Sequence, residues 1–223
     1  MATRKQSFAI NEYYHLYNRG VEKRIIFLDN QDYKFFLYLM QICNSKKSIR
    51  VKELKKEFER GETIVNIGAY VLMSNHFHIL IKEKIENGIS LYMLKLLTTY
   101  SMYFNKKYKR TGRLFEGTFK SSHVATDTYL KYLYSYIHLN PAKIINKNWK
   151  EVRAKSVNEL LKFVSEYKYS SLQEYENEKI KNERKILELG TFPPYFKSFS
   201  EHKSELFGWL SLQGNPCKIL QFK

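Results

Sequence analysis

Residues 64–82, IVNIGAYVLMSNHFHILIK, contain two apolar runs separated by a short turn, MSN. The runs at 64–72 and 76–82 are rich in the β-branched and aromatic residues that strands favour. The stretch therefore predicts two adjacent strands joined as an antiparallel hairpin. The second strand also carries His76 and His78, so an otherwise apolar strand holds two imidazoles.

The two histidines are spaced so that they share one face of this strand. Side chains alternate along a strand, so His76 and His78 point the same way and Phe77 points the other way. The two histidine Cα atoms are then roughly 7 Å apart, which lets both imidazoles converge on one ion. The alternative is that both rings hydrogen-bond to backbone or water on a half-exposed sheet face, and the motif alone leaves both open.

The remaining core elements are expected between residues 12 and 140. They are a strand at 12–18, a helix that begins at Asp29 or Asn30, a helix at 89–104, a strand at 114–125 and a helix at 128–140 that stops at Pro141. With the hairpin, the order is strand, helix, two strands, helix, strand, helix. This order lacks the regular βαβ alternation of a doubly wound fold, so we expect an α+β fold with helices packed on an antiparallel sheet.

Two segments are more charged than this core. Residues 44–62, NSKKSIRVKELKKEFERGE, have only a thin apolar stripe and predict a solvent-exposed helical excursion. Beyond about residue 150 the chain becomes Glu/Lys-rich and then carries aromatic residues, with no second core evident. We therefore expect one domain over residues 1–150, and a partly helical C-terminal extension over 151–223 that is a candidate DNA-binding segment.

The charge balance points to a polyanionic partner. The 223 residues include 38 Lys and Arg against 22 Asp and Glu, a net charge of +16. The 18 Tyr and 15 Phe add faces on which nucleic-acid bases can stack. The alternative is a solubility surface, or the lysine-rich codon usage of an AT-rich genome.

Other classes of protein are disfavoured. The sequence has no run of some 18 apolar residues, and its start, MATRKQSFAINEYY, lacks the apolar region of a secretory signal, so we expect a cytoplasmic protein with no membrane partner. Cys43 and Cys217 belong to no CxxC pair, which argues against a zinc knuckle or a disulfide framework.

A second group of candidate functional residues lies in the segment YIHLNP, at the end of the last core helix. Residues four apart share a helix face, so Tyr136 and Asn140 project together while His138 is rotated away. The alternative is a buried tyrosine followed by an Asn that caps the helix before proline. Tyr132 and Tyr134 are rival phenols, but Tyr134 projects away from the face of Asn140, and we expect Tyr132, one turn earlier, to lie in the core.

Packing of this helix face against the two histidines would create a metal site. Two imidazole nitrogens from His76 and His78 and the amide oxygen of Asn140 would surround the ion, with a phenol nearby. Mixed nitrogen and oxygen ligands with open positions suit Mg²⁺ or Mn²⁺. A phenol has a free pKa of about 10 and is a poor nucleophile unless a cation or a base assists it. Near such an ion, Tyr136 becomes capable of covalent phosphodiester chemistry.

Four blocks of sequence follow one another along the chain: YYHLYNRG at 13–20, AYVLMSNHFHILI at 69–81, GRLFEGTFKSSHV at 112–124 and YLYSYIHLNPAK at 132–143. Together and in this order they resemble the single-tyrosine HUH transposases, and specifically the branch that includes the REP-associated tyrosine transposases. A further segment, YKYSSLQEY at 167–175, is similar to one often seen downstream in that family.

The resemblance implies a ferredoxin-like domain that acts on single-stranded DNA, often near hairpins. The HUH name denotes two histidines that flank a hydrophobic residue, and these correspond to His76 and His78. The nucleophile of the family corresponds to Tyr136, and its third metal-binding position corresponds to Asn140. Members cleave one strand by tyrosine attack, which leaves a 5′-phosphotyrosine and a free 3′-OH that can later rejoin strands without ATP. We therefore expect His76, His78 and Tyr136 to be catalytic, with Mg²⁺ or Mn²⁺ as cofactor.

Alternatives to this interpretation stay open. A domesticated protein that binds hairpin-bearing DNA or RNA without cleaving it would keep the same fold. A replication initiator or plasmid relaxase is disfavoured, because such proteins usually carry further domains. Both a monomer and a homodimer with a shared site are compatible with the family. The chain departs from many relatives in its longer segment 44–62 and in the absence of a glycine soon after Pro141.

A basic cluster precedes the strand that leads to the proposed nucleophile helix and could hold a DNA backbone. A solvated helix end is the alternative for each lysine taken singly. We expect His15 and His123 to be sheet residues with satisfied rings. The expected DNA contacts are Lys106, Lys107, Lys109, Arg110 and Arg113 of the cluster, together with Arg19 and Lys120.

Overall fold

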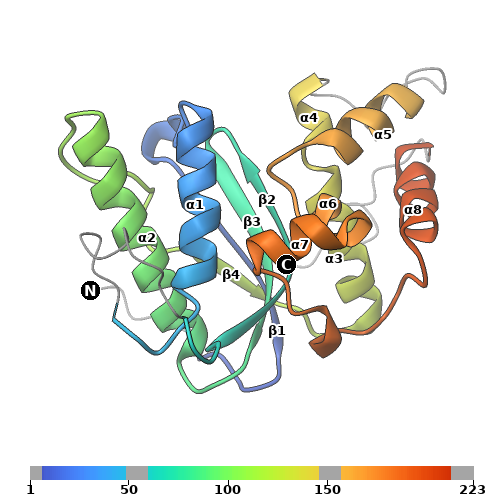
Figure 1. Ribbon diagram of the computed structural model, residues 1–223, viewed down its shortest axis with the longest axis horizontal. Coiled ribbons are helices and arrows are strands. Elements are labelled where there is room, and N and C mark those ends of the chain that lie inside the picture. The colour runs from blue at the N-terminus through green and yellow to red at the C-terminus, as the bar shows by residue number, and fades with distance from the viewer. Residues whose placement is uncertain (1–6, 49–59, 146–156, 212–223) are drawn as a thin grey trace.

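The structure is a computed structural model that describes residues 7–48, 60–145 and 157–211. It has three layers, with a central sheet, two long helices on one face and the helix at 127–139 on the other, while the short helix at 178–184 contacts the first long helix (Figure 1). None of the helices within those ranges is long and apolar enough to cross a bilayer.

The sheet has four antiparallel strands in the order β2-β3-β1-β4. A long helix lies between β1 and β2 and another lies between β3 and β4, which gives the ferredoxin-like arrangement and confirms the predicted α+β fold. The strands are β1 Tyr13–Arg19, β2 Val65–Met73, β3 His76–Glu83 and β4 Lys120–His123.

The last strand is shorter than the sequence predicts. The expected strand at 114–125 is reduced to the four residues of β4, so that prediction is wrong in its extent. Before it, Phe115 makes only an isolated bridge to Gly20, and Gly117 has a φ of 145°, which breaks the extended path.

The helices begin and end close to their sequence signals. Asp29 caps the first long helix and Thr126 caps the helix that carries Tyr136, each by accepting a backbone N–H bond. The helices are α1 Asn30–Ile42, α2 Gly88–Lys107, α3 Asp127–Leu139, α4 Ala142–Ile145, α5 Val157–Glu166, α6 Leu172–Glu176, α7 Glu178–Arg184 and α8 Phe199–Ser211, with short 3-10 helices η1 Val21–Lys23 and η5 Leu189–Thr191.

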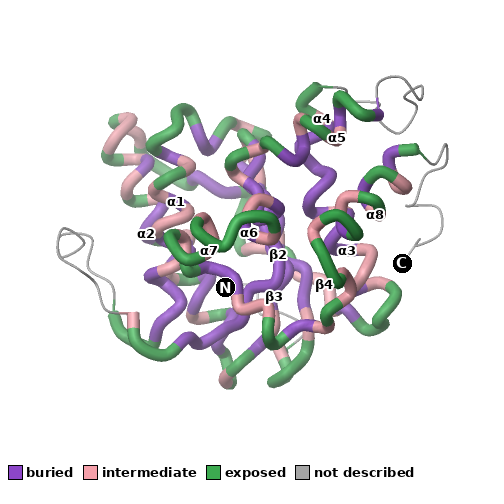
Figure 2. Tube along the Cα trace, turned by 45° about the vertical axis from the view of Figure 1, so that its right-hand side comes forward, coloured by how far each residue is buried: buried purple, intermediate pink, exposed green. Residues whose placement is uncertain are grey.

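Alternation along β3 divides its side chains between two cores. Phe77 packs in the cluster beneath α1 and α2, 5.4 Å from the ring of Phe36. Leu80 packs instead with Leu133 and Ile137 of α3. The buried strands run through the middle of the molecule, as the purple tube in Figure 2 shows. His76 and His78, in phase with Leu80, therefore face α3.

The C-terminal part of the chain builds a further core. Leu160 and Val164 of α5 pack with Leu206 of α8 and with Leu139 at the end of α3. The expectation of no second core beyond residue 150 is therefore wrong. The proposed domain boundary at residue 150 and most of the proposed helical excursion at 44–62 lie outside the described residues, and the two-part division stays a prediction.

The segment 167–175 attaches this C-terminal part to the sheet. Leu72 donates its backbone N–H to the carbonyl of Tyr169 over 2.9 Å, and Ser171 donates to the carbonyl of Tyr70 over 3.0 Å. These bonds extend the outer edge of β2 by a short bridge. The sequence block similar to the downstream family segment therefore completes one side of the sheet.

Candidate active site

The two histidines of β3 and the tyrosine of α3 come together. The ring centroids of His76 and His78 are 5.2 Å apart with planes nearly perpendicular, at 86°. The ring of Tyr136 lies edge-on to His78, with centroids 5.5 Å apart and planes at 82°. A half-buried phenol therefore lies against His78, so the structure brings Tyr136 next to the paired histidines.

Asn140 closes α3 one helical turn after Tyr136. It is the C-cap residue and is buried, and its side-chain Nδ2 donates to the carbonyl of Tyr136 over 2.8 Å. Its Oδ1 accepts a 2.8 Å hydrogen bond from Nζ of Lys143, whose ammonium lies 5.4 Å from the centroid of the Tyr136 ring. Sequence reasoning missed Lys143, although it ends the YLYSYIHLNPAK block, three residues after Asn140.

His15 of β1 also belongs to this group. Its Nε2 lies 2.9 Å from Nδ1 of His78, and its ring lies edge-on to Tyr136 with centroids 5.8 Å apart. We expected His15 to be a sheet residue whose ring is hydrogen-bonded. Its ring does make a hydrogen bond, but the sequence did not predict its position beside His78 and Tyr136. The register that pairs Tyr17 with His78 sets this contact, and a single sequence does not reveal that register.

Burial keeps the three imidazoles neutral. It lowers the pKa of His15 to about 4. It also lowers the pKa of His76 to about 4, with further contributions from the charges of Lys143 and Arg19. The pKa of His78 falls well below its usual value for the same reason, with smaller contributions from His15, His76 and Lys143. Neutral imidazoles at pH 7 are the form that binds metal ions.

These residues fit a divalent ion at the paired histidines. Nδ1 of His76 lies 2.7 Å from Oδ1 of Asn75, and Nδ1 of His78 lies 2.9 Å from Nε2 of His15, so Nε2 of each histidine can bind an ion when it carries no proton. Asn140 adds an amide oxygen with two lone pairs, one of which Lys143 already engages. In the part of the chain that the structure describes, no three His, Cys, Asp or Glu side chains are grouped to hold a metal, and this donor set contains only two such residues.

A family comparison decides the identity of the domain. The model for IS200-like transposases matches residues 28–140, which is 113 of the 223 residues. The chain belongs to the IS200-like transposase family. The matched range contains His76, His78 and Tyr136 and ends at Asn140, whereas His15 lies before it.

Among solved structures, the transposase is similar to a REP-associated tyrosine transposase bound to a REP hairpin. The two chains are 14% identical, the likeness covers 90% of this chain and 96% of that one, and the TM-score is 0.48. No curated protein matches the sequence.

The other candidate phenols of the transposase are placed differently. Tyr134 is buried among aromatic residues, and burial raises its pKa well above its usual value. Tyr132 lies one turn before Tyr136, where its ring packs edge-on against Trp209 with centroids 5.3 Å apart. His138 is fully buried and its Nε2 lies 2.8 Å from the Ser171 hydroxyl, so it faces away from the paired histidines, as the helix phase predicts.

Two of the proposed DNA contacts lie beside the paired histidines. Arg19 is opposite His76 in the pairing of β1 with β3, and its Nε forms a 2.6 Å ion pair with Glu116. The exposed Lys120 is opposite Tyr17 on the neighbouring strand, and Tyr17 is in turn opposite His78. Both cations therefore lie on the α3 face of the sheet, because alternate residues of β1 point there.

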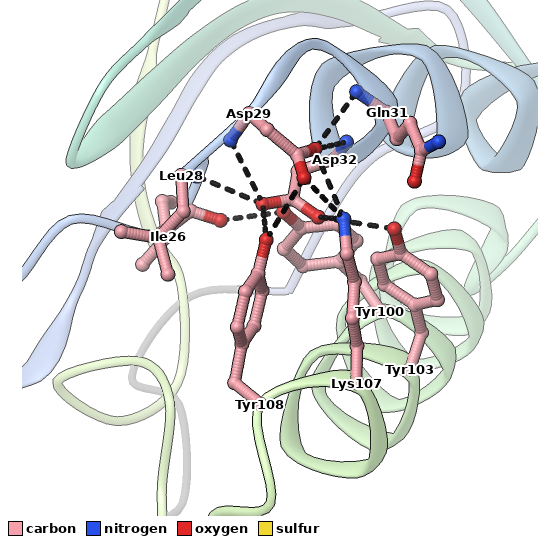
Figure 3. Close-up of polar contacts among 9 residues, drawn as sticks. All are labelled: Ile26, Leu28, Asp29, Gln31, Asp32, Tyr100, Tyr103, Lys107 and Tyr108. Atoms are coloured by element: carbon pink, nitrogen blue, oxygen red, sulfur yellow. Dashed lines mark hydrogen bonds and ion pairs between the residues drawn. The ribbon is translucent and has the colours of Figure 1, made fainter.

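The structure does not bring the basic cluster next to the histidines, because α2 covers the opposite face of the sheet. Lys107 is engaged there in ion pairs of 2.8 Å with both Asp29 and Asp32 (Figure 3). The Tyr108 hydroxyl also donates to Asp32 over 2.7 Å. Lys106, Lys109 and Arg113 are exposed, and Arg110 bonds to Asn105. Their contact with DNA stays a prediction.

Proposed function

We propose that this transposase cleaves and rejoins one strand of hairpin-bearing single-stranded DNA through a covalent intermediate on Tyr136. The contact that supports this proposal is the edge-on packing of the Tyr136 ring on His78, with centroids 5.5 Å apart. It joins two motifs that are far apart in the chain. Membership of the IS200-like transposase family supports the same reaction class.

The reaction needs a nucleophilic phenol oxygen. Oη of Tyr136 attacks the scissile phosphorus, a new oxygen–phosphorus bond forms, and the bond between phosphorus and the 3′-oxygen breaks. The proton lost by the phenol is balanced by one taken up at the leaving 3′-oxygen. The product is a 5′-phosphotyrosine with a free 3′-OH, and reversal with another 3′-OH rejoins strands. No ATP is consumed because the phosphodiester energy is kept in the covalent link.

Four side chains would prepare the phosphate for this attack. His76 and His78, with Asn140, would hold Mg²⁺ or Mn²⁺, which when bound polarises the phosphoryl group. The ammonium of Lys143 lies beside both Asn140 and Tyr136, where it can neutralise a phosphate oxygen.

The test is formation of a covalent protein–DNA adduct. Incubation with hairpin-bearing single-stranded DNA and Mn²⁺, followed by denaturing electrophoresis, should show the adduct in the native protein and none in Tyr136→Phe. Tyr132→Phe, which removes a phenol one helical turn away, is the matched control and should keep the adduct. An adduct that persists in Tyr136→Phe would place the nucleophile elsewhere, and its absence in every protein would favour a non-cleaving DNA-binding function.

A further inference from the structure

Asn75 fixes the proton on one ring nitrogen of His76. Its Nδ2 donates to the carbonyl of Lys23 over 3.0 Å, so its Oδ1 is the atom that faces His76. That oxygen lies 2.7 Å from Nδ1 of His76 and can only accept a hydrogen bond. Nδ1 of His76 therefore carries the proton, and Nε2 carries the lone pair.

His15 makes the corresponding contact with His78. Its Nε2 lies 2.9 Å from Nδ1 of His78, their ring planes are 24° apart, and both side chains are buried. One of these two nitrogens must carry the proton. If Nδ1 of His78 carries it, Nε2 of His78 has a lone pair available for an ion. If His15 donates instead, the proton of His78 sits on Nε2 and ligation through that atom is blocked.

We propose that His15 and Asn75 are positioning residues that each accept a hydrogen bond from Nδ1 of the adjacent histidine and so present Nε2 of His78 and His76 to the divalent ion. This inference rests on the proposed function, because it concerns the same ion. A metal-binding imidazole commonly donates its other N–H to a fixed acceptor, which sets the tautomer and the ring orientation. The match to the family model begins at residue 28, so it does not include His15.

The location of His15 strengthens the assignment. Its ring lies against both His78 and Tyr136, with centroids 5.0 Å and 5.8 Å away. A residue that orients His78 therefore also packs against Tyr136, the proposed nucleophile. A hydrogen bond to the carbonyl of Lys23 holds the Asn75 side chain, and the pairing of β1 with β3 positions His15. Backbone outside the paired histidines therefore fixes both acceptors.

The tautomer can be measured without metal or DNA. Long-range proton–nitrogen correlation spectra of the histidine rings in the full-length protein should show His76 and His78 protonated at Nδ1. In His15→Phe, which keeps ring shape but offers no acceptor, His78 should shift toward protonation at Nε2. His15→Gln places an amide oxygen near the lost Nε2 and should restore the Nδ1 form. A His78 protonated at Nε2 in the native protein would overturn the proposal.

Mn²⁺ binding gives the second measurement. The dissociation constant, followed by the electron paramagnetic resonance of free Mn²⁺, should rise roughly tenfold or more in His15→Phe and in Asn75→Ala. His15→Gln should stay within about threefold of the native value, because one retained hydrogen bond preserves most of that effect. Unchanged affinity in His15→Phe, or three imidazole nitrogens around bound Mn²⁺ in pulsed spectra, would overturn the positioning role.

These outcomes separate the inference from the proposed function. A native protein that binds no Mn²⁺ would contradict the proposed metal site, while the ring spectra would still decide whether His15 and Asn75 set the tautomers. A protein that binds Mn²⁺ but forms no adduct on Tyr136 would contradict the proposed reaction alone. Thermal unfolding of each variant would show whether a loss of affinity reflects a loss of folding.

Discussion

Nζ of Lys143 lies 2.8 Å from Oδ1 of Asn140, the atom proposed as a ligand of the divalent ion. A metal ion and an ammonium group at the same oxygen repel each other. The same ammonium favours the arrival of a phosphate. If the proposed site is correct, we expect Lys143 to oppose ion binding in the free protein and to support the reaction once DNA is bound.

Replacement of Lys143 by methionine should separate these two effects. Lys143→Met should bind Mn²⁺ about tenfold more tightly, which corresponds to about 1.4 kcal/mol, because a nearby positive charge is removed. It should also form the covalent DNA adduct more slowly, because a phosphate partner is lost. Mn²⁺ titration and adduct kinetics would measure both. Lys131→Met, which removes a cation of α3 that pairs with Glu205, is the control and should change neither.

Removal of a proposed metal ligand should abolish cleavage but not DNA binding. His76→Ala should form no adduct, while its affinity for hairpin-bearing DNA and the salt dependence of that affinity should stay close to native, since basic side chains dominate binding. His123→Ala changes a histidine of β4 that bonds to Glu12 and should keep both properties. Loss of binding together with cleavage in His76→Ala would indicate unfolding rather than loss of a ligand.

Lys107 should matter more for stability than for DNA. Asp32 is fully buried and receives bonds from Lys107 and Tyr108, so Lys107→Met would leave a buried carboxylate short of its cation (Figure 3). We expect a loss of about 3 kcal/mol in the free energy of unfolding. Lys106→Met, at the exposed neighbour, should change that free energy by less than about 0.5 kcal/mol. Equal effects of both substitutions in urea denaturation would contradict the structural role of Lys107.

A buried histidine pair should make the fold sensitive to acid. His202 lies 3.3 Å from His138 and packs near Tyr175, and burial lowers its pKa from the usual 6.5 to about 4. Between these values the unfolded chain binds more protons than the folded one, so stability falls as the pH drops from 6.5 through 4. This histidine alone accounts for roughly 3 kcal/mol of that loss.

His202→Phe tests this linkage, because a phenyl ring can keep the stacking on Phe196, whose ring centroid is 4.1 Å away. The difference in the free energy of unfolding between pH 7 and pH 4.5 should be smaller in the variant than in the native protein. It should not vanish, since burial also lowers the pKa of His15 and His76. The same pH difference in both proteins would contradict the assignment.

The sequence predicts the sheet and the helix starts because their signals are local. Alternation in β3, the caps at Asp29 and Thr126, and the helix phase of Tyr136 and Asn140 each depend on residues a few positions apart. The α+β class, the hairpin and the shared face of Tyr136 and Asn140 could therefore be predicted from one chain.

The remaining parts depend on contacts between distant residues. His15 meets His78 only through the register of two strands 63 residues apart, which no local pattern encodes. Lys143 reaches Asn140 because a separate short helix, α4, follows Pro141 after α3 has ended where the sequence predicts. The further core of the C-terminal part packs Leu160 against the distant Leu206. Both leucines lie in charged segments, so the apolar residues of this core do not stand out along the sequence.

The bridge between Val71 and Ser170 has a consequence for the sheet as a whole. All nine residues of β2 are buried, and β2 is an outermost strand of the sheet. Without a covering segment, the edge of such an apolar strand would present unpaired backbone N–H and C=O groups. A strand of another copy could pair with them, which is a route by which sheet proteins aggregate. Residues 169–171 bond to part of that edge, so we expect this late segment to oppose fibrous self-association of a protein rich in tyrosine and phenylalanine.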